Sequence, residues 1–155
     1  MRIDHINIVV AHIEKSEKFY IEVLGLEKTL DLHLEESWME ELTGFKKPSA
    51  KCVFLETPSK NCRIELLEYI NPKTTFIDLD LQHNLNTQGI RHIAFEVDDI
   101  FDIYEKAKKY GVEFISKPVL APLDIVPHGK ALCYLKAPDG VILELAQYGK
   151  SLYNA

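Results

Sequence analysis

The chain contains two copies of one pattern, and this repeat limits the folds available to it more than any other feature. The segment IDHINIVVAHIEKSEKFYIEVLGLE, which starts at Ile3, matches IRHIAFEVDDIFDIYEKAKKYGVEF, which starts at Ile90. Each copy opens with Ile-X-His-Ile, becomes helical in pattern, and reaches a glycine, Gly25 or Gly111, where a left-handed helix cap is expected. A repeat of this length indicates a duplicated supersecondary unit.

A second pair of segments extends the repeat. KCVFLETPSKNCRIELLEY resembles ALCYLKAPDGVILELAQY, and both contain an apolar strand, a turn with proline and a second strand that ends in Tyr. Glu65 therefore corresponds to Glu144, and Phe54 to Tyr134. Together the two repeats predict an α+β fold built from two tandem βαβββ modules.

The repeats also predict the domain boundaries. The expected parts are a first module at 1–70 with an insertion at about 31–50, a linker at 71–88, a second module at 89–150 and a tail at 151–155. The insertion carries an amphipathic pattern around Trp38, which we expect to pack over the edge of the sheet.

Strand alternation predicts where the repeated polar side chains point. His5, His92, Glu65 and Glu144 all fall on the strand faces turned away from the helices. A single His or Glu on a strand is usually solvated or satisfied locally, but the same two residue types recur at the same two places. If the modules join their sheets around a pseudo-twofold axis, the four converge, and facing carboxylates repel unless a cation lies between them. The pattern therefore predicts one concave surface on which the four side chains hold one divalent metal. Neighbouring side chains expected to support the ligands or touch substrate are Asn7, Arg63, Tyr69, Glu96 and Tyr134.

Composition excludes several classes of function. The net charge is −6 and the pI about 5.5, without a basic block, which argues against nucleic acid or anionic membranes as partners. No apolar run approaches the roughly 18 residues of a membrane span. The N-terminal MRIDHINIVV lacks the features of a signal peptide, and the three scattered cysteines indicate free thiols, so we expect a cytoplasmic protein.

The chain resembles the vicinal oxygen chelate superfamily, which includes glyoxalase I, methylmalonyl-CoA epimerase, extradiol dioxygenases and drug-binding resistance proteins. The resemblance covers nearly the whole chain. It lies in Ile-Asp-His5-Ile, Arg-Ile-Glu65-Leu, Gly-Ile-Arg-His92-Ile-Ala-Phe-Glu-Val and Pro-Asp-Gly-Val-Ile-Leu-Glu144-Leu. It implies a glyoxalase-like fold in which the paired modules form a metal-lined incomplete barrel, with the metal held by these four residues.

This resemblance implies a chemistry. Two imidazoles and two carboxylates suit Ni, Co, Zn, Mn or Fe as a divalent ion and leave positions for a small substrate with vicinal oxygens. We expect an isomerase or lyase that acts through a metal-stabilised enolate or enediolate. By similarity to glyoxalase I, Glu144 is the first candidate for a ligand that also acts as the base, and Glu65 is the second. We also expect a homodimer.

The subfamily and the substrate stay open. Glyoxalase I proteins commonly have Arg where this chain has Val9 and Asn where it has Tyr69, whereas epimerases usually have Gln in place of Glu65. An extradiol dioxygenase using Fe(II) would employ His5, His92 and Glu144, with Tyr134 nearby. A non-catalytic protein that binds a drug or metabolite without metal is the remaining alternative.

Overall fold

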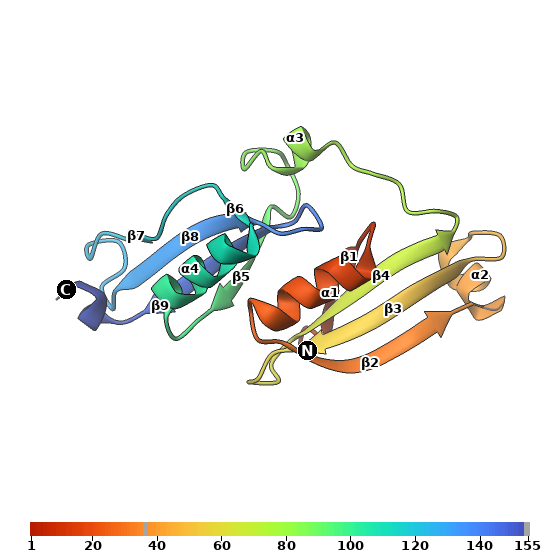
Figure 1. Cartoon of the computed structure of the whole chain (residues 1–155), viewed down its shortest axis with the longest axis horizontal. Coiled ribbons are helices and arrows are strands. Elements are labelled where there is room, and N and C mark those ends of the chain that lie inside the picture. Colours follow the sequence, from red (N-terminus) through yellow and green to blue (C-terminus); the bar gives the residue numbers. More distant parts are fainter. Residues whose placement is uncertain (36, 154–155) are drawn as a thin grey trace. The chain divides into compact units, whose positions relative to one another are not determined.

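The chain forms two compact α+β units, Met1–Phe76 and Ile77–Ala155. This computed structural model describes residues 1–35 and 37–153. Residue 36 of the predicted insertion and residues 154 and 155 of the predicted tail lie outside the described residues. The α+β class is confirmed, and the strands of each unit form an open sheet in the described part of the chain (Figure 1).

In the first unit, one helix lies against one face of a four-stranded sheet (Figure 1). Its elements are β1 (His5–Val9), α1 (Ile13–Glu22), β2 (Glu27–Leu34), α2 (Ser37–Thr43), β3 (Ser49–Glu56) and β4 (Arg63–Asn71). The strand order is β1-β4-β3-β2, with β1 parallel to β4 and the other pairs antiparallel. This is a βαβββ module with α2 inserted between its second and third strands.

The second unit repeats this topology. Its elements are α3 (Leu79–Gln82), β5 (His92–Glu96), α4 (Ile100–Tyr110), β6 (Glu113–Phe114), β7 (Val119–Leu120), β8 (Lys130–Lys136), β9 (Ile142–Tyr148) and a 3₁₀ helix, η1 (Lys150–Tyr153). The order β5-β9-β8-β6 matches that of the first sheet, again with one parallel pair. The long second strand of the module is reduced here to the two-residue strands β6 and β7, which both pair with β8.

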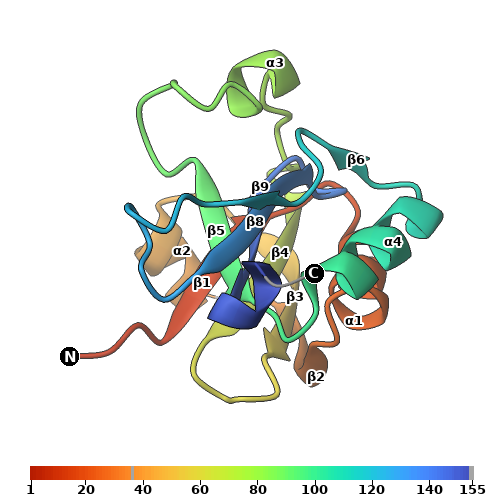
Figure 2. The same cartoon turned by 90° about the vertical axis from the view of Figure 1, so that its left-hand side faces the viewer.

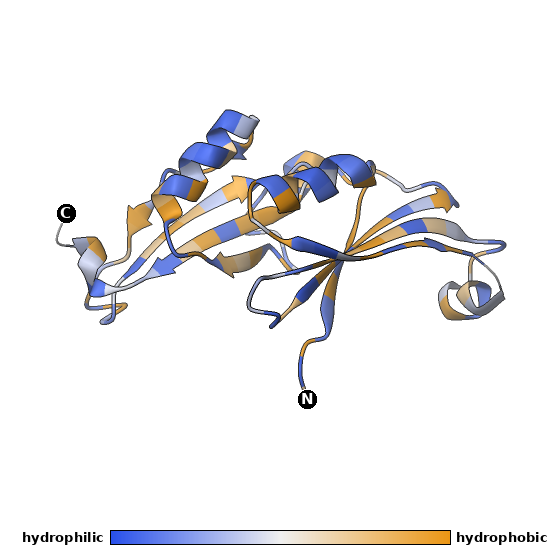
Figure 3. Cartoon of the chain, turned by 60° about the horizontal axis from the view of Figure 1, so that its bottom comes forward, coloured by the Kyte–Doolittle hydropathy of each residue, from blue (hydrophilic) through white to orange (hydrophobic). Residues whose placement is uncertain are grey.

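The helices are held by burial of their apolar faces. In α1, Phe19 and Tyr20 are fully buried, and Ile100 and Ala107 are the fully buried residues of α4. The outward faces of both helices are hydrophilic (Figure 3). Gly111 caps α4 with φ of 90°, a conformation that favours glycine, so this predicted cap is confirmed.

The predicted insertion at 31–50 contains both strand and helix. Its first residues continue β2 as far as Leu34, and its last residues begin β3. Between them, α2 packs through Met39 on Ala50, Cys52 and Leu67. These residues lie on the sheet face opposite α1, and Figure 3 shows α2 on that side. A short helix therefore covers part of the face that carries His5 and Glu65.

The residues on both sides of the second module pack against it. Before it, the guanidinium of Arg91 donates to the carbonyls of Leu81 and Gln82 at 3.4 Å, which ties the end of α3 to the start of β5. After it, η1 lies beside the beginning of β8 (Figure 1, Figure 2). The Tyr153 hydroxyl accepts from the Lys130 amide at 3.3 Å and donates to the Ala121 carbonyl. In the described part of the chain, the longest helix has 11 residues and none could cross a membrane.

A duplicated hydrogen bond joins each helix to its sheet. The Glu68 carboxylate accepts from the Ile13 amide at 2.9 Å, at the first turn of α1. The Gln147 side-chain oxygen accepts from the Ile100 amide at 3.0 Å, at the first turn of α4. Each acceptor stands three residues after Glu65 or Glu144 on the same strand, so it faces the helix while the glutamate faces the other way. Both bonds satisfy helix amides that lack an intrahelical partner.

We therefore expect Gln147→Ala to lower the free energy of unfolding by about 1 kcal/mol, because it leaves the Ile100 amide without its acceptor. Urea denaturation followed by circular dichroism measures the change. Gln147→Glu restores the acceptor found in the first unit and should cost less, and Gln88→Ala, at an exposed position, is the control. An equal loss in Gln147→Ala and Gln88→Ala would contradict a capping role.

Candidate functional site

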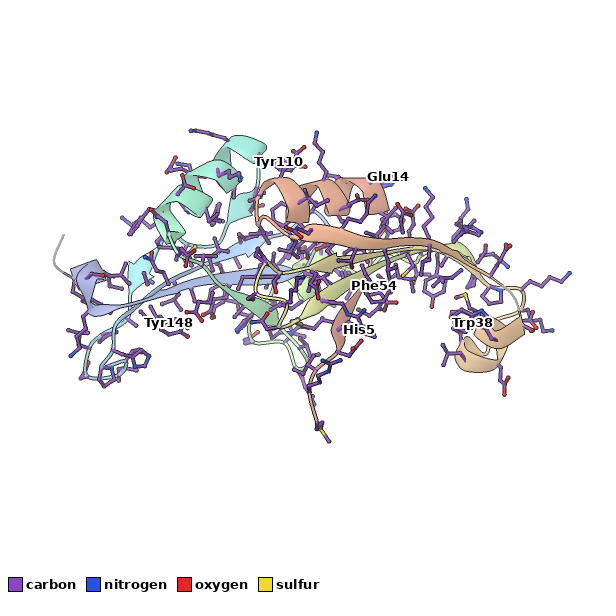
Figure 4. The ribbon with its side chains drawn as sticks, turned by 90° about the horizontal axis from the view of Figure 1, so that it is seen from below. His5, Glu14, Trp38, Phe54, Tyr110 and Tyr148 are labelled. Atoms are coloured by element: carbon purple, nitrogen blue, oxygen red, sulfur yellow. The ribbon has the colours of Figure 1, made fainter. Side chains whose placement is uncertain are left out.

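The first unit brings His5, Glu65 and Asn7 together. The parallel register of β1 and β4 places Asn7 opposite Glu65, so the histidine lies two residues back on the same face. His5 Nε2 is 3.4 Å from Glu65 Oε2, and Asn7 Nδ2 donates to the same oxygen at 2.8 Å. The Cys52 thiol lies 3.5 Å from the other oxygen, Oε1. Figure 4 shows His5 and Phe54 on the side of the sheet away from Glu14 of α1.

Asp4 orients the imidazole of His5. Its carboxylate lies 2.9 Å from His5 Nδ1, and the Arg63 guanidinium forms an ion pair with the same carboxylate. The hydrogen bonds with His5 and then Arg63 hold the pKa of Asp4 below its usual value. A carboxylate on Nδ1 fixes the ring and leaves Nε2 directed at Glu65, an arrangement common behind metal-ligating histidines.

The second unit brings His92, Glu144, Lys130 and Tyr134 together. The register of β5 and β9 places Ala94 opposite Glu144, which is the register of the first unit. His92 Nε2 is 3.3 Å from Glu144 Oε2. Lys130 Nζ donates to Glu144 Oε1 at 2.6 Å. The glutamate therefore presents one oxygen to a histidine and the other to an ammonium group.

An aromatic ring stands beside each histidine. Phe54 meets His5 edge-on with ring centroids 5.5 Å apart, and Tyr134 lies 5.2 Å from His92. Both rings come from the strand position directly opposite the glutamate. Burial, then the charge of Glu144 and a hydrogen bond to it, raise the pKa of Tyr134 above its usual value. The second unit thus has the hydroxyl group of Tyr134 where the first has the apolar ring of Phe54.

The two glutamates differ in burial and in partners. The Glu144 side chain is 6% exposed and that of Glu65 is 17% exposed. Burial lowers the pKa of Lys130, but the hydrogen bond and charge of Glu144, with a further contribution from Tyr148, outweigh this effect and raise it above its usual value. The ammonium group therefore stays charged beside the more buried carboxylate.

Two predicted site residues lie away from these pairs. Tyr69 stands four positions beyond Glu65 on β4, where its ring packs against Phe45 at 5.7 Å. Glu96 is the exposed last residue of β5, four positions beyond His92. Arg63 is nearer, but it serves Asp4 and lies over the Phe54 ring at 4.9 Å. Of the predicted supporting residues, Asn7 is hydrogen-bonded to a candidate ligand, and the Tyr134 ring packs against another, His92.

Sequence reasoning missed three residues that contact the candidate ligands: Asp4, Cys52 and Lys130. Repeat matching does not find them, because the equivalent positions hold Arg91, Leu132 and Ala50. Asp4 had a detectable signal, since an acid directly before a candidate ligand histidine is well placed to reach Nδ1. Lys130 and Cys52 become visible once the strand register shows that they share a face with the glutamates.

Each His/Glu pair fits half of a metal site. Two ligand atoms that are each about 2.1 Å from one ion lie roughly 3.0 to 3.4 Å apart at tetrahedral or octahedral angles. The nitrogen–oxygen separations of 3.4 and 3.3 Å agree with this spacing. Within residues 1–35 and 37–153, no group of three or more His, Cys, Asp or Glu side chains forms such a site. One unit alone therefore supplies two donors of the four predicted.

Comparison with known families and relatives supports the sequence resemblance. A family model described as the glyoxalase/bleomycin resistance protein/dioxygenase superfamily matches residues 4–125. The uncharacterised protein YwbC of Bacillus subtilis is 31% identical over 94% of this chain and 97% of its own length. The mitochondrial methylmalonyl-CoA epimerase of Homo sapiens is 28% identical over 94% of this chain and 73% of its own length. A glyoxalase family protein from Bacillus cereus has a similar structure, with a TM-score of 0.85 and 25% identity over 96% of this chain and 94% of that one.

The cysteines provide a test of the site's local environment. Burial, then the charge of a nearby glutamate, raises the pKa of Cys52 and of Cys133 to about 12. Cys62, by contrast, is partly exposed. At about pH 8 we expect iodoacetamide to modify Cys62 in the native protein and to spare the other two, because the thiolate is the reactive form. Peptide mass spectrometry measures this, and unfolding in urea should expose all three. Native modification of Cys52 as fast as Cys62 would contradict the described packing.

Proposed function

Because this chain belongs to the glyoxalase/bleomycin resistance protein/dioxygenase superfamily, we propose that it is a divalent-metal-dependent isomerase or lyase. In this proposal it moves a proton at the carbon next to a carbonyl group. The observation that carries the proposal is the duplicated pair of an imidazole nitrogen and a carboxylate oxygen at ligand spacing, on equivalent strands of both units.

We propose His5, Glu65, His92 and Glu144 as the ligands of one ion, contributed as two pairs. Imidazole and carboxylate donors suit Ni, Co, Zn, Mn or Fe. The ion would supply a Lewis acid that polarises the substrate carbonyl. Asp4 and Asn7 support this assignment, since they hold His5 Nε2 and Glu65 Oε2 in place.

The proposed base is Glu144, with Glu65 as the second candidate. Lys130 occupies Oε1 of Glu144, so Oε2, on the side of His92, is the oxygen that could accept a proton. Tyr134, which stands opposite Glu144 on the neighbouring strand, could keep that carboxylate oriented during proton transfer. Glu65 is more exposed and contacts neutral donors, which supports a role at the substrate as well.

For the substrate, we propose an acyl thioester with a second oxygen near the reacting carbon. The mammalian relatives named as methylmalonyl-CoA epimerases match almost the whole of this chain. A carbon between two carbonyl groups is acidic enough for a carboxylate base, which fits proton transfer without redox chemistry.

Metal binding gives the first test. Equilibrium dialysis against Co²⁺ followed by elemental analysis should find about one ion per proposed quartet of ligands. His5→Ala and His92→Ala should each weaken binding by at least about tenfold, because each removes a donor. The matched control is His33→Ala, because His33 forms an exposed pair with Glu35 at 3.4 Å that has no counterpart in the second unit. Binding that tolerates both His5→Ala and His92→Ala would exclude the proposed ligands.

Exchange of the α-proton gives the second test. In D₂O, the metal-loaded protein should exchange the α-proton of one member of a panel of acyl-CoA thioesters and 2-oxo thiohemiacetals, followed by NMR. Glu144→Gln should reduce the rate by about 100-fold or more, because the amide cannot act as a base. Glu113→Gln, at an exposed carboxylate paired with Lys136, is the control. Exchange at the parent rate in Glu144→Gln would exclude this base.

Ring cleavage is the second candidate function, and the position of Tyr134 beside His92 and Glu144 favours it. An oxygen-consumption assay, added to the exchange and metal-binding assays, separates the two functions. Oxygen consumption with a catechol by the Fe(II)-loaded protein, without exchange on any thioester, would assign the site to an extradiol-type dioxygenase. Absence of metal binding, with retention of a small molecule, would indicate the non-catalytic binding protein.

A further inference from the structure

The ion pair between Lys130 and Glu144 is the most enclosed ion pair with a lysine in the described residues. The side chains are 19% and 6% exposed, and Nζ lies 2.6 Å from Oε1. The other lysine pairs are more open, such as Lys136–Glu113, in which the carboxylate is 70% exposed. A carboxylate as buried as Glu144 would strongly destabilise the fold if no opposite charge or hydrogen-bond donor compensated it. Lys130 therefore supplies a positive charge that offsets the buried carboxylate of Glu144.

The lysine breaks the symmetry between the repeats. Lys130 pairs with Tyr148 across β8 and β9, and its equivalent, Ala50, pairs with Tyr69 across β3 and β4. In the first unit that position is a fully buried alanine beneath Met39. Glu65, which has no lysine partner among the described contacts, is also the more exposed glutamate. The lysine thus lies beside Glu144, the glutamate that is less exposed to solvent.

The backbone of Lys130 is held on several sides. The Tyr153 hydroxyl lies 3.3 Å from its amide nitrogen and 3.2 Å from its carbonyl oxygen. The residue before Lys130 is Gly129. It packs so closely on Gly149 that a Cβ added to Gly129 would lie 2.6 Å from the Gly149 carbonyl oxygen. The ammonium group of Lys130 also lies 5.5 Å from the centroid of the Tyr148 ring. These contacts limit how far the ammonium group can move from Glu144.

We propose that Lys130 is an internal counter-ion that competes with the divalent metal for Glu144 and thereby sets the metal affinity of the site. This inference rests on the proposed role of Glu144 as a metal ligand. Lys130 acts through Glu144, so it is a positioning residue. It holds Oε1 of the carboxylate and leaves Oε2 beside His92.

The competition follows from charge. A divalent ion at Oε2 would lie within a few ångströms of the ammonium group on Oε1, and like charges at that distance repel strongly in a partly buried site. The ammonium group also draws electron density from the carboxylate through a charge-assisted hydrogen bond, which weakens it as a donor. Both effects lower metal affinity, and both disappear when the lysine charge is removed.

The test is calorimetric titration of the metal-free, full-length protein with Co²⁺ at constant pH and ionic strength. Lys130→Met should bind Co²⁺ about tenfold more tightly than the parent protein, or better. Lys130→Arg keeps the charge and should remain within about threefold of the parent. Lys136→Met is the matched control, because Lys136 lies on the same strand and sheet face with an exposed partner, and it should change affinity by less than about twofold.

Thermal unfolding provides a readout that does not depend on activity. In EDTA, Lys130→Met should melt several degrees below the parent, because Glu144 is left buried without a counter-ion. Saturating Co²⁺ should remove most of that difference, because the metal replaces the lysine as the counter-charge. If Lys130→Met does not fold, Lys130→Gln retains a hydrogen-bond donor without the charge and should show the same two effects.

Each outcome has a separate meaning. Tighter binding in the uncharged variants, with unchanged binding in Lys130→Arg and Lys136→Met, supports the inference. Equal or weaker binding in both uncharged variants overturns it and leaves the proposed function standing, because the parent protein still binds Co²⁺. A melting deficit that is equal in EDTA and in Co²⁺ would make Lys130 merely structural and would also overturn it. Failure of the parent protein to bind Co²⁺ would overturn the proposed function, and this inference with it.

Discussion

The parallel pairing of β1 with β4, and of β5 with β9, is the constraint on which both half-sites depend. It sets Asn7 opposite Glu65 and Ala94 opposite Glu144, so a histidine two residues earlier shares a face with the glutamate. A shift of register by one residue would turn the whole strand over. The same strands place Glu68 and Gln147 on the opposite face, where they bind the first amides of α1 and α4. Helix capping and the candidate ligands are thus fixed by one register.

The units share this backbone but differ in the charges around their glutamates. Glu65 contacts the imidazole of His5, the amide of Asn7 and the thiol of Cys52, and none of its described contacts is a lysine. Glu144 contacts an imidazole and an ammonium group and stands opposite the phenol of Tyr134. The second carboxylate can be more buried because it has a permanent counter-ion. Two chemically equal side chains thereby acquire different environments, a condition that allows them different chemical roles.

The sequence predicted those features that occur twice. Repetition of Ile-X-His-Ile and of the Glu-Leu strand indicated two βαβββ modules, and alternation placed His5, Glu65, His92 and Glu144 on the faces away from the helices. Features present once gave no such signal. Lys130 is separated from Glu144 by a turn and most of a strand, so only the register reveals their contact. The short strands β6 and β7 are similarly hard to predict, because two residues are too few to show the alternation of apolar and polar side chains that marks a strand.

The same distinction explains how a duplicated fold can acquire a specialised site. Its register cannot change in one copy without losing the buried core face, so divergence is confined to side chains at equivalent positions. Five such substitutions surround the candidate ligands: Asp4 against Arg91, Asn7 against Ala94, Ala50 against Lys130, Cys52 against Leu132 and Phe54 against Tyr134. In the first unit they add groups that orient His5 and Glu65, and Arg91 instead ties α3 to the second unit. In the second unit they add a hydroxyl and a cation that act on Glu144. The two copies supply matching histidine–glutamate pairs, and the unmatched residues give each pair its own hydrogen-bond partners and charges.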